Sequence, residues 1–485
     1  MSFLDAILSP LRCIQDYAKV IADADVDWKN LVVLFSLGVY VLETYLLSRQ
    51  YPYYSREAPP PALSQHFPGE TFQKSQNYGR DKARFAFVYS AFGEILGIGL
   101  IYAGAQVWAW KIAGEWLTKW GYVGYEIPQS ILFMGILLLA SAIPFLPLSY
   151  YQTFVLEEKH GFNKMNVRLF ITDTLKGWAL TFFIGSPFLA GFLWIIRWAG
   201  DGFIPWLMSF LIAFQLVMVV LYPTVIQPLF NKLSPLPQGP LRTRIEALAS
   251  RLKFPLTDLY VIDGSKRSAH SNAYFYGLPW SKHIVIYDTL IKQSAPEEIE
   301  AVLAHELGHW WYSHPLKLMI ISEVHLLLLF SAFPAFLQSA SLLTSFGFPT
   351  SVARHPPIII SFMLFQNLFT PVEALLTMAM NAVSRYFEWQ ADKFAFEQDV
   401  SDNDEKAATE GKDGSTDGVA ADDMGERLAK ALIGLHKENL SSVWVDWLYS
   451  AYHHSHPTLP ERLRVMDDLR SQKNLREGAS AKKEL

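Results

Sequence analysis

The sequence predicts a mainly α-helical, polytopic membrane protein that also carries a small α+β domain. Of its 485 residues, 51% are hydrophobic and only 18% are charged, whereas soluble proteins average about 25% charged residues. The mean hydropathy is +0.16, and long apolar runs alternate with polar loops. These observations exclude a disordered chain and an ordinary cytosolic enzyme. The net charge of −5 also argues against nucleic acid as a partner.

Seven stretches are apolar and long enough to cross about 30 Å of hydrocarbon, which takes roughly 20 helical residues. They lie near Leu31–Leu47, Phe85–Trp110, Ser130–Leu148, Trp178–Trp198, Phe203–Val225, Leu318–Leu343 and Ile358–Val383. The first residues, MSFLDAILSPL, lack a basic segment and a small-residue cleavage site. We therefore expect no removable signal peptide before the first span.

Basic residues in the connecting loops predict the orientation of the spans. The loops after the first and third spans carry ten of them: Arg49, Arg56, Lys74, Arg80, Lys82, Arg84, Lys159, Lys164, Arg168 and Lys176. The loops on the other side carry four: Lys111, Lys119, Arg197 and Arg354. The positive-inside rule then places the N-terminus outside the cytosol and the C-terminus inside it. The final residues, Lys482-Lys483-Glu484-Leu485, resemble a dilysine retrieval signal for the endoplasmic reticulum.

The polar segments divide the chain into four regions. Residues 1–226 hold the first five spans, and residues 318–384 hold the sixth and seventh. Between them, residues 227–317 read as a helix (241–254), three strands (258–263, 271–277 and 283–288) and a second helix. Residues 385–485 read as a helical segment with an acidic insert at about 399–423, which we expect to be disordered.

The strongest motif lies on the helix that follows the third strand. His305 and His309 are four residues apart, so both imidazoles project from one helix face and can bind one Zn²⁺. Glu306 lies beside them and can take a proton from an attacking water, which completes the HExxH pattern of zinc peptidases. The alternative is a pair of surface histidines on an amphipathic helix. His314 has the wrong spacing for this face and is interpreted as a bystander.

A catalytic zinc needs a third protein ligand, and the single cysteine, Cys13, excludes sites built from several thiolates. The candidate is Glu388, in SRYFEWQADKFA beyond the seventh span. Asp392 lies one turn later and can hold the outer nitrogen of a ligand histidine. The alternative is a solvated helix end with a charge ladder that starts at Arg385.

Two further segments contain candidate substrate-binding groups. His456 or Arg462, in the run that begins SHPT, could hydrogen-bond the oxyanion of an amide hydrolysis. The alternative is a polar loop that caps a helix. The run HSNAYFYG reads as an edge strand to which an extended peptide could add, with Asn272 and Tyr274 as its candidate binding residues. The alternative is an aromatic packing strand.

Ionisable residues inside three of the apolar spans suggest an aqueous interior. They are Glu94, Glu323, His325 and Glu373, and such groups must face protein or water rather than lipid. Hydrogen bonds between helices are the alternative explanation for each of them.

Five motifs together resemble the type I CAAX prenyl endopeptidases. They are HELGH, SRxxExQAD, SHP-x4-R, HSNAYFYG and EEKHGFNK (residues 157–164), and the match runs from about the first span to about Arg464. The resemblance implies seven helices in a barrel around a large chamber, closed on the cytosolic side by a zinc metalloprotease domain. It also implies location in the endoplasmic reticulum membrane and the inner nuclear membrane.

The same resemblance implies roles for individual residues. His305, His309 and Glu388 would hold one zinc ion, and Glu306 would be the catalytic base. Asn272, His456 and Arg462 would lie around the substrate and the transition state. The partners would be prenylated C-terminal peptides within the lipid membrane, cut to release the last three residues.

Three other functions remain open. A membrane quality-control zinc protease shares HExxH and the downstream glutamate, but the seven spans and EEKHGFNK argue against it. An intramembrane site-two protease would have HExxH inside a span and a later LDG motif, and this sequence has neither. A chambered transporter with a structural zinc would release no peptide product.

Overall fold

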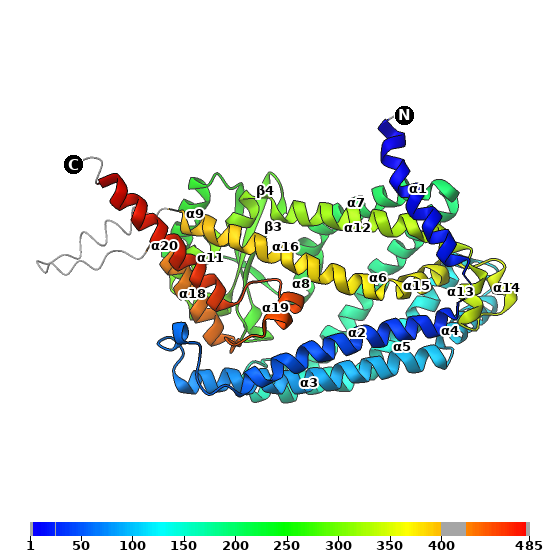
Figure 1. Cartoon of the computed structure of the whole chain (residues 1–485), viewed down its shortest axis with the longest axis horizontal. Helices are drawn as coiled ribbons and strands as arrows, with labels where there is room; N and C mark the ends of the chain where they lie inside the picture. Colours follow the sequence, from blue (N-terminus) through cyan, green and yellow to red (C-terminus); the bar gives the residue numbers. More distant parts are fainter. Residues whose placement is uncertain (1–2, 25, 399–422, 482–485) are drawn as a thin grey trace, which may run out of the picture.

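The computed structural model describes residues 3–24, 26–398 and 423–481. Figure 1 shows an elongated molecule in which long helices run side by side and a small sheet lies near one end. Helix α1 (Phe3–Ala22) lies at the opposite end from α20 (Leu459–Ala481). The structure therefore separates a helical bundle from a sheet domain, which contains β1–β4, α9–α11, α18 and α20.

The bundle is built from helices on both sides of the sheet domain in the sequence. They are α2 (Trp28–Gln50), α3 (Gly69–Tyr102), α4 (Ala105–Lys119), α5 (Glu126–Tyr151), α6 (Val167–Ala199), α7 (Phe203–Leu221), α12 (His314–Leu337), α13 (Ala340–Ser345), α14 (Thr350–Ala353), α15 (Ile358–Leu368) and α16 (Thr370–Phe396). Short helix α8 (Gln227–Phe230) leads into the sheet domain, and α19 (Trp447–His453) packs beside α2 and α16.

Five helical runs are long and apolar enough to cross a membrane: Trp28–Ser55, Gly69–Tyr102, Glu126–Glu157, Val167–Phe230 and His314–Leu337. The pair α15 and α16 makes a sixth if this bent pair is one span. The predicted mainly helical, multi-pass architecture is confirmed at this level, while the number seven exceeds the five or six helices found in the described residues.

One of these runs contains a sharp break. The run Val167–Phe230 has 64 residues, which is about three times the length needed for one crossing. The backbone leaves the helical conformation at Gly200 (φ 51°, ψ −132°), and α6 and α7 then pack against each other. The rings of Trp198 and Trp206 lie 5.3 Å apart, and those of Phe188 and Phe214 lie 4.6 Å apart. These pairs have the register of an antiparallel helical hairpin.

The ends of two predicted spans were wrong. The second was expected to reach Trp110, but α3 ends at Tyr102 because the chain turns at Gly104 (φ +67°), a conformation that favours glycine. The sixth was expected to reach Leu343, but α12 ends at Leu337. There the hydroxyl of Ser339 caps a new helix, α13, by accepting a hydrogen bond from the amide of Leu342.

The seventh predicted span, Ile358–Val383, is not one straight helix. Helix α15 ends at Leu368, and α16 leaves it at an angle of 63°. Pro371 lies in the first turn of α16, where its ring and missing N–H prevent the preceding helix from continuing. The same helix extends beyond the span to Phe396, so it carries residues from the bundle into the sheet domain.

The sheet domain contains four strands in the order β1-β2-β4-β3. They are β1 (Leu233–Pro235), β2 (Leu256–Ile262), β3 (Ala273–Leu278) and β4 (Ser281–Tyr287). Strands β2 and β4 are parallel, and the other two pairs are antiparallel. The expected helix and three strands are present, whereas β1 was not predicted. Within the described residues β3 pairs with β4 alone, so the prediction of an edge strand in HSNAYFYG is confirmed.

Helices α9 (Pro240–Arg251), α10 (Asp288–Gln293), α11 (Pro296–Trp311), α18 (Met424–Glu438) and α20 surround the sheet. The acidic insert lies outside the described residues except for Asp423, whose side chain caps α18. Helix α11 packs closely against α16 because Gly308 has no side chain: a Cβ there would lie 3.1 Å from the Cα of Ala391. This close approach brings the HELGH and SRYFEWQAD segments together.

Candidate metal centre

Three ligand-type side chains converge where α11 meets α16. Nε2 of His305 lies 3.3 Å from Oε2 of Glu388, and Nε2 of His309 lies 3.2 Å from Oε1 of the same carboxylate. The two Nε2 atoms are 3.2 Å apart. His305 and Glu388 are buried, and His309 is half-buried. The helical spacing of four residues therefore directs both imidazoles to one point, and α16 supplies a carboxylate there.

The outer nitrogen of His305 has a charged partner. Its Nδ1 lies 2.8 Å from Oδ1 of Asp392, which is fully buried. Arg462 of α20 donates from Nε to the other Asp392 oxygen at 2.8 Å, and its NH2 group contacts both Oδ1 and His305. Burial alone would raise the pKa of Asp392, but the Arg462 and His305 contacts outweigh burial and hold it below its usual value.

The outer nitrogen of His309 has a neutral partner. Its Nδ1 lies 2.9 Å from Nδ1 of His314, and Nε2 of His314 lies 3.0 Å from Oε1 of Gln390. One proton arrangement satisfies all three groups: His309 donates to His314, and His314 donates to Gln390. This arrangement leaves the lone pair of His309 Nε2 free to bind a metal.

The interpretation of His314 as a bystander was wrong. It assumed one continuous helix, but α11 ends at Trp311 and Ser313 adopts a left-handed conformation (φ +56°) before α12 starts at His314. This turn returns the side chain of His314 to His309, where it also stacks on Phe387 at 4.1 Å. Five-residue spacing alone could not show the turn, and Gln390 was likewise not identified.

The pKa values of the two carboxylates at the centre, Glu388 and Glu306, are shifted in opposite directions. Burial would raise the pKa of Glu388, but its close contacts with His305 and His309 and the charge of His456 hold it far below its usual range. Burial raises the pKa of Glu306, and the charge of Glu388 raises it further. The charges of His305 and His309 lower it, but the net shift is upward. Glu388 is therefore an anion, whereas Glu306 binds a proton more readily than an exposed glutamate.

His456 lies on the open side of the cluster. Its Nε2 is 3.3 Å from Oε1 of Glu388, and its side chain is 64% exposed. Ser455 lies 2.9 Å from its other ring nitrogen. Arg462 is buried and lies 3.8 Å from Oε2 of Glu388. Both residues from the SHPT segment therefore border the same carboxylate, one exposed and one held by Asp392.

Asn272 and Tyr274, the two candidate substrate-binding residues of HSNAYFYG, lie in different surroundings. Asn272 is exposed, and its side-chain oxygen accepts from the amide of Ala273 at 2.8 Å, at the start of β3. Tyr274 points to α8, where its hydroxyl accepts from Gln227, and its ring lies near Tyr276 and Tyr287 rather than near the three clustered residues. Burial raises the pKa of Tyr274 to about 12, so it stays protonated.

The ionisable residues of the spans all have partners in neighbouring helices. Ser36 donates to Glu94 at 3.0 Å, and Gln215 donates to Glu323. His325 and Glu373 lie 3.1 Å apart. These contacts are the hydrogen bonds between helices that the sequence left open, and they link α2 to α3, α7 to α12 and α12 to α16.

The three clustered residues fit a metal ion. Two imidazole nitrogens and one carboxylate oxygen lie within 4.8 Å of one another, and this is a donor set that catalytic zinc sites use. Oε2 of Glu388 is buried yet makes no well-formed hydrogen bond with the described residues. A cation at this point would satisfy that oxygen, and Asp392 and His314 already orient the two imidazoles.

Known protein families and individual relatives match this chain over most of its length. Residues 50–232 match the family model described as CAAX prenyl protease N-terminal, five membrane helices, and residues 235–470 match peptidase family M48. CAAX prenyl protease 1 of Saccharomyces cerevisiae is 39% identical over 471 residues, covering 93% of this chain and 98% of the relative. The chain belongs to the CAAX prenyl protease 1 family.

Members of this family from distant organisms are also similar. The homologue from Arabidopsis thaliana is 40% identical over 91% of this chain and 98% of its own length. The Homo sapiens homologue is 36% identical over 90% of this chain and 95% of its own. The crystal structure of S. mikatae Ste24p matches with a TM-score of 0.80 and 40% identity, covering 91% of this chain and 99% of that one.

Membership of the family confirms the resemblance found in the motifs. The chain is a multi-pass membrane metallopeptidase, and the M48 family implies a metal cofactor. The cluster of His305, His309 and Glu388 lies within the region matched to M48. The roles of the individual site residues stay predictions, and they are taken up below.

Proposed function

We propose that this chain is a zinc-dependent endopeptidase that removes the C-terminal tripeptide from prenylated CAAX proteins. The observation that carries the proposal is the convergence of His305, His309 and Glu388, within 4.8 Å, beside Glu306 of the same HExxH helix. The substrate class follows from the curated relatives, which are named CAAX prenyl protease 1 and align over nearly their whole length.

Each group at the centre has a distinct task in this proposal. Zinc, when bound by His305, His309 and Glu388, supplies the Lewis acidity that polarises the scissile carbonyl and acidifies water. Glu306 accepts the proton of the attacking water and passes it to the leaving amine. Asp392 and His314 hold the two ligand imidazoles in one tautomer.

His456 and Arg462 would stabilise the oxyanion by different means. His456 is exposed next to Glu388 and can donate directly to the oxyanion. Arg462 is fixed by two hydrogen bonds to Asp392, so it acts as a fixed positive charge behind Glu388. The free edge of β3 offers main-chain groups to an extended substrate, with Asn272 at its start.

We also propose seven membrane crossings in place of the five or six continuous helical runs. The hairpin packing of α6 against α7 divides the 64-residue run into two crossings, and α15 with α16 makes one bent crossing. An odd number of crossings agrees with α1 and α20 lying at opposite ends of the molecule (Figure 1).

We also propose a hydrated interior for the bundle and a location and orientation for the protein in the cell. A hydrated chamber inside the bundle would supply water to the buried oxygens of Glu94 and Glu323 that make no hydrogen bond with the described residues. We place the protein in the endoplasmic reticulum membrane and the inner nuclear membrane, with the sheet domain and C-terminus in the cytosol. The prenyl chain of a substrate would lie in the surrounding lipid.

The test is cleavage of a farnesylated CAAX peptide by the purified full-length protein, with released tripeptide measured by mass spectrometry. Glu306→Gln should keep zinc and lose at least about 100-fold in kcat, the range of general base catalysis. Glu388→Ala should lose zinc and activity together. The matched control is Glu397→Ala, an exposed carboxylate just past the end of α16.

Two outcomes would remove residue roles from the proposal, and two others would overturn the function itself. Full activity of Glu306→Gln would remove Glu306 as the base, and an unchanged zinc content of Glu388→Ala would remove Glu388 from the ligands. A protein that cuts an unprenylated membrane protein but no prenylated peptide would be a quality-control protease. A protein that releases no peptide but carries solute across vesicles would be a transporter.

A further inference from the structure

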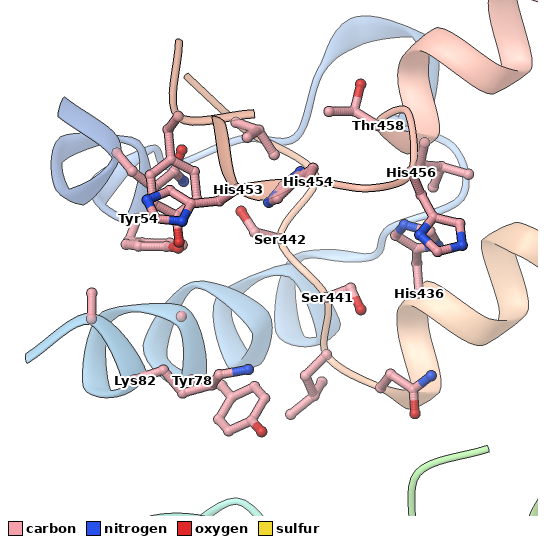
Figure 2. Close-up of a pocket in the computed structure, with 18 of the residues that line it drawn as sticks. Tyr54, Tyr78, Lys82, His436, Ser441, Ser442, His453, His454, His456 and Thr458 are labelled. Carbon is pink, nitrogen blue, oxygen red and sulfur yellow. The ribbon is translucent and has the colours of Figure 1, made fainter. Parts of the chain in front are cut away.

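A second feature adjoins the metal centre. A cavity of about 740 Å³ lies between residues 78–86 of α3, the segment joining α18 to α19, and the segment that precedes α20. His456 and Arg462, which border Glu388, form part of its lining, so the cavity adjoins the candidate metal centre. Its volume is within the range of about 300–1,000 Å³ that holds small ligands. Figure 2 shows Lys82 and Tyr78 on one wall and His456 at the other end.

The permanently charged residues that line this cavity are cations. Among the described residues it contains one lysine, one arginine and five histidines, but no aspartate or glutamate. Of the two permanent cations, Arg462 is already paired with Asp392. Lys82 has no carboxylate within 4.0 Å among the described residues, and its Nζ lies 4.8 Å from the centre of the Tyr78 ring. The cavity therefore suits an anionic ligand, and Lys82 is the cation available to it.

One half-buried histidine gives the cavity a hydrogen-bond acceptor. Nδ1 of His436 lies 2.8 Å from the carbonyl oxygen of Leu432, so this nitrogen carries the proton. Burial lowers the pKa of His436 to about 4, so the ring is neutral. Its Nε2 makes no hydrogen bond with the described residues and can accept one from a ligand N–H in the cavity. A peptide has such N–H groups, whereas inorganic anions such as phosphate have none.

The carboxylate of Glu157 interacts with Lys82 but does not line this cavity. It accepts from the Tyr78 hydroxyl at 3.0 Å and lies 3.9 Å from His270. Glu157 therefore offsets part of the charge of Lys82 without filling the cavity, which leaves room for a ligand carboxylate beside Lys82.

We propose that this cavity holds the last three residues of the substrate and that Lys82 binds their free α-carboxylate. This inference rests on the proposed function. Three extended residues span about 10 Å, so the terminus lies well away from the cleaved bond while the first residue lies beside His456. Anchoring the carboxylate at Lys82 fixes which peptide bond reaches the metal, which is why cleavage occurs three residues from the end.

The test compares two farnesylated peptides that differ only at the C-terminus, one a free acid and one an amide. We expect the wild-type protein to prefer the acid by about 10–100-fold in kcat/KM, the range for a charge-assisted hydrogen bond. Lys82→Met should remove that preference by slowing the acid and sparing the amide, and mainly through KM. Lys82→Arg should restore most of it. Lys74→Met, on the same helix but paired with Glu70 outside the cavity, is the matched control.

A binding measurement separates this inference from the proposed function. Zinc-loaded Glu306→Gln protein should bind the acid more tightly than the amide, and Lys82→Met in that background should abolish the difference. Preferential binding without cleavage by the wild-type protein would contradict the proposed function and leave the cavity assignment standing. Equal wild-type affinity for acid and amide, or an equal loss for both in Lys82→Met, would overturn the assignment.

Discussion

The two proposed ligand histidines are held by opposite kinds of partner. His305 is backed by the carboxylate of Asp392, which Arg462 in turn binds from α20. His309 is backed by the neutral ring of His314 and the amide of Gln390. Both partners fix an imidazole tautomer, but only the first changes the charge of the site. We call these the charged side and the neutral side.

The difference between these two partners indicates how the net charge of the site is kept low. A carboxylate behind a ligand histidine makes the imidazole a stronger donor, and Arg462 offsets the negative charge that Asp392 brings. Glu306 and Glu388 already place two carboxylates at the proposed metal site. A further carboxylate behind His309 would leave excess negative charge in a buried site, whereas His314 orients the ring without adding any.

The largest effect is expected where the charged side is broken. Arg462→Met leaves Asp392 buried without its cationic partner, which should lower the free energy of unfolding by about 3–5 kcal/mol. Denaturation of the zinc-free protein in detergent would measure this loss. Arg470→Met, at a half-exposed arginine of the same helix, should cost less than about 1 kcal/mol. Equal losses in the two variants would show that Arg462 is no buried ion-pair partner.

The next largest effect concerns metal binding. Asp392→Asn keeps the size of the side chain but removes its charge, so His305 becomes a weaker donor. Zinc affinity should fall by about 100-fold, the upper range for a residue behind a ligand histidine. Competition with a coloured chelator would measure this value. An unchanged affinity would show that the charge of Asp392 does not act on the metal.

The sequence could predict the carboxylate of the charged side, but neither the position of Arg462 behind Asp392 nor the neutral side. His305, His309, Glu388 and Asp392 lie on helices with regular spacing, so a shared face can be derived from position alone. His314 follows a left-handed residue between two helices, and helical spacing does not apply across that turn. The same limit explains Gln390, whose role depends on the position of His314.

The fold likewise has features that the sequence could predict and features that it could not. Span number and class depend on composition, which is local, and they could be predicted to within one or two helices. The break at Gly200 and the bend before Pro371 depend on how helices pack after a glycine or a proline. Likewise, the cavity beside the metal centre combines residues from α3, α18 and α19, which are far apart in the sequence.

A smaller loss is expected on the neutral side. His314→Phe keeps the stacking on Phe387, 4.1 Å away, but removes the acceptor for His309. Zinc affinity should fall by about 10-fold, the lower range for such partners. His355→Phe, at an exposed histidine in a bundle loop, is the matched control and should have no effect. A loss as large as that of Asp392→Asn would contradict the distinction between the two sides.

The smallest effect should come from the outer member of the neutral side. Gln390→Met removes the acceptor of His314 Nε2 but leaves His314 Nδ1 beside His309. Without Gln390, His314 can protonate either nitrogen, so only part of its population offers an acceptor to His309. A tautomer shift of this kind should weaken zinc binding by about two- to three-fold and leave kcat of the zinc-saturated protein unchanged. In a His314→Phe background the same change should have no effect, because the two residues act in series. Additive losses in the double variant would show that Gln390 reaches the metal centre by another route.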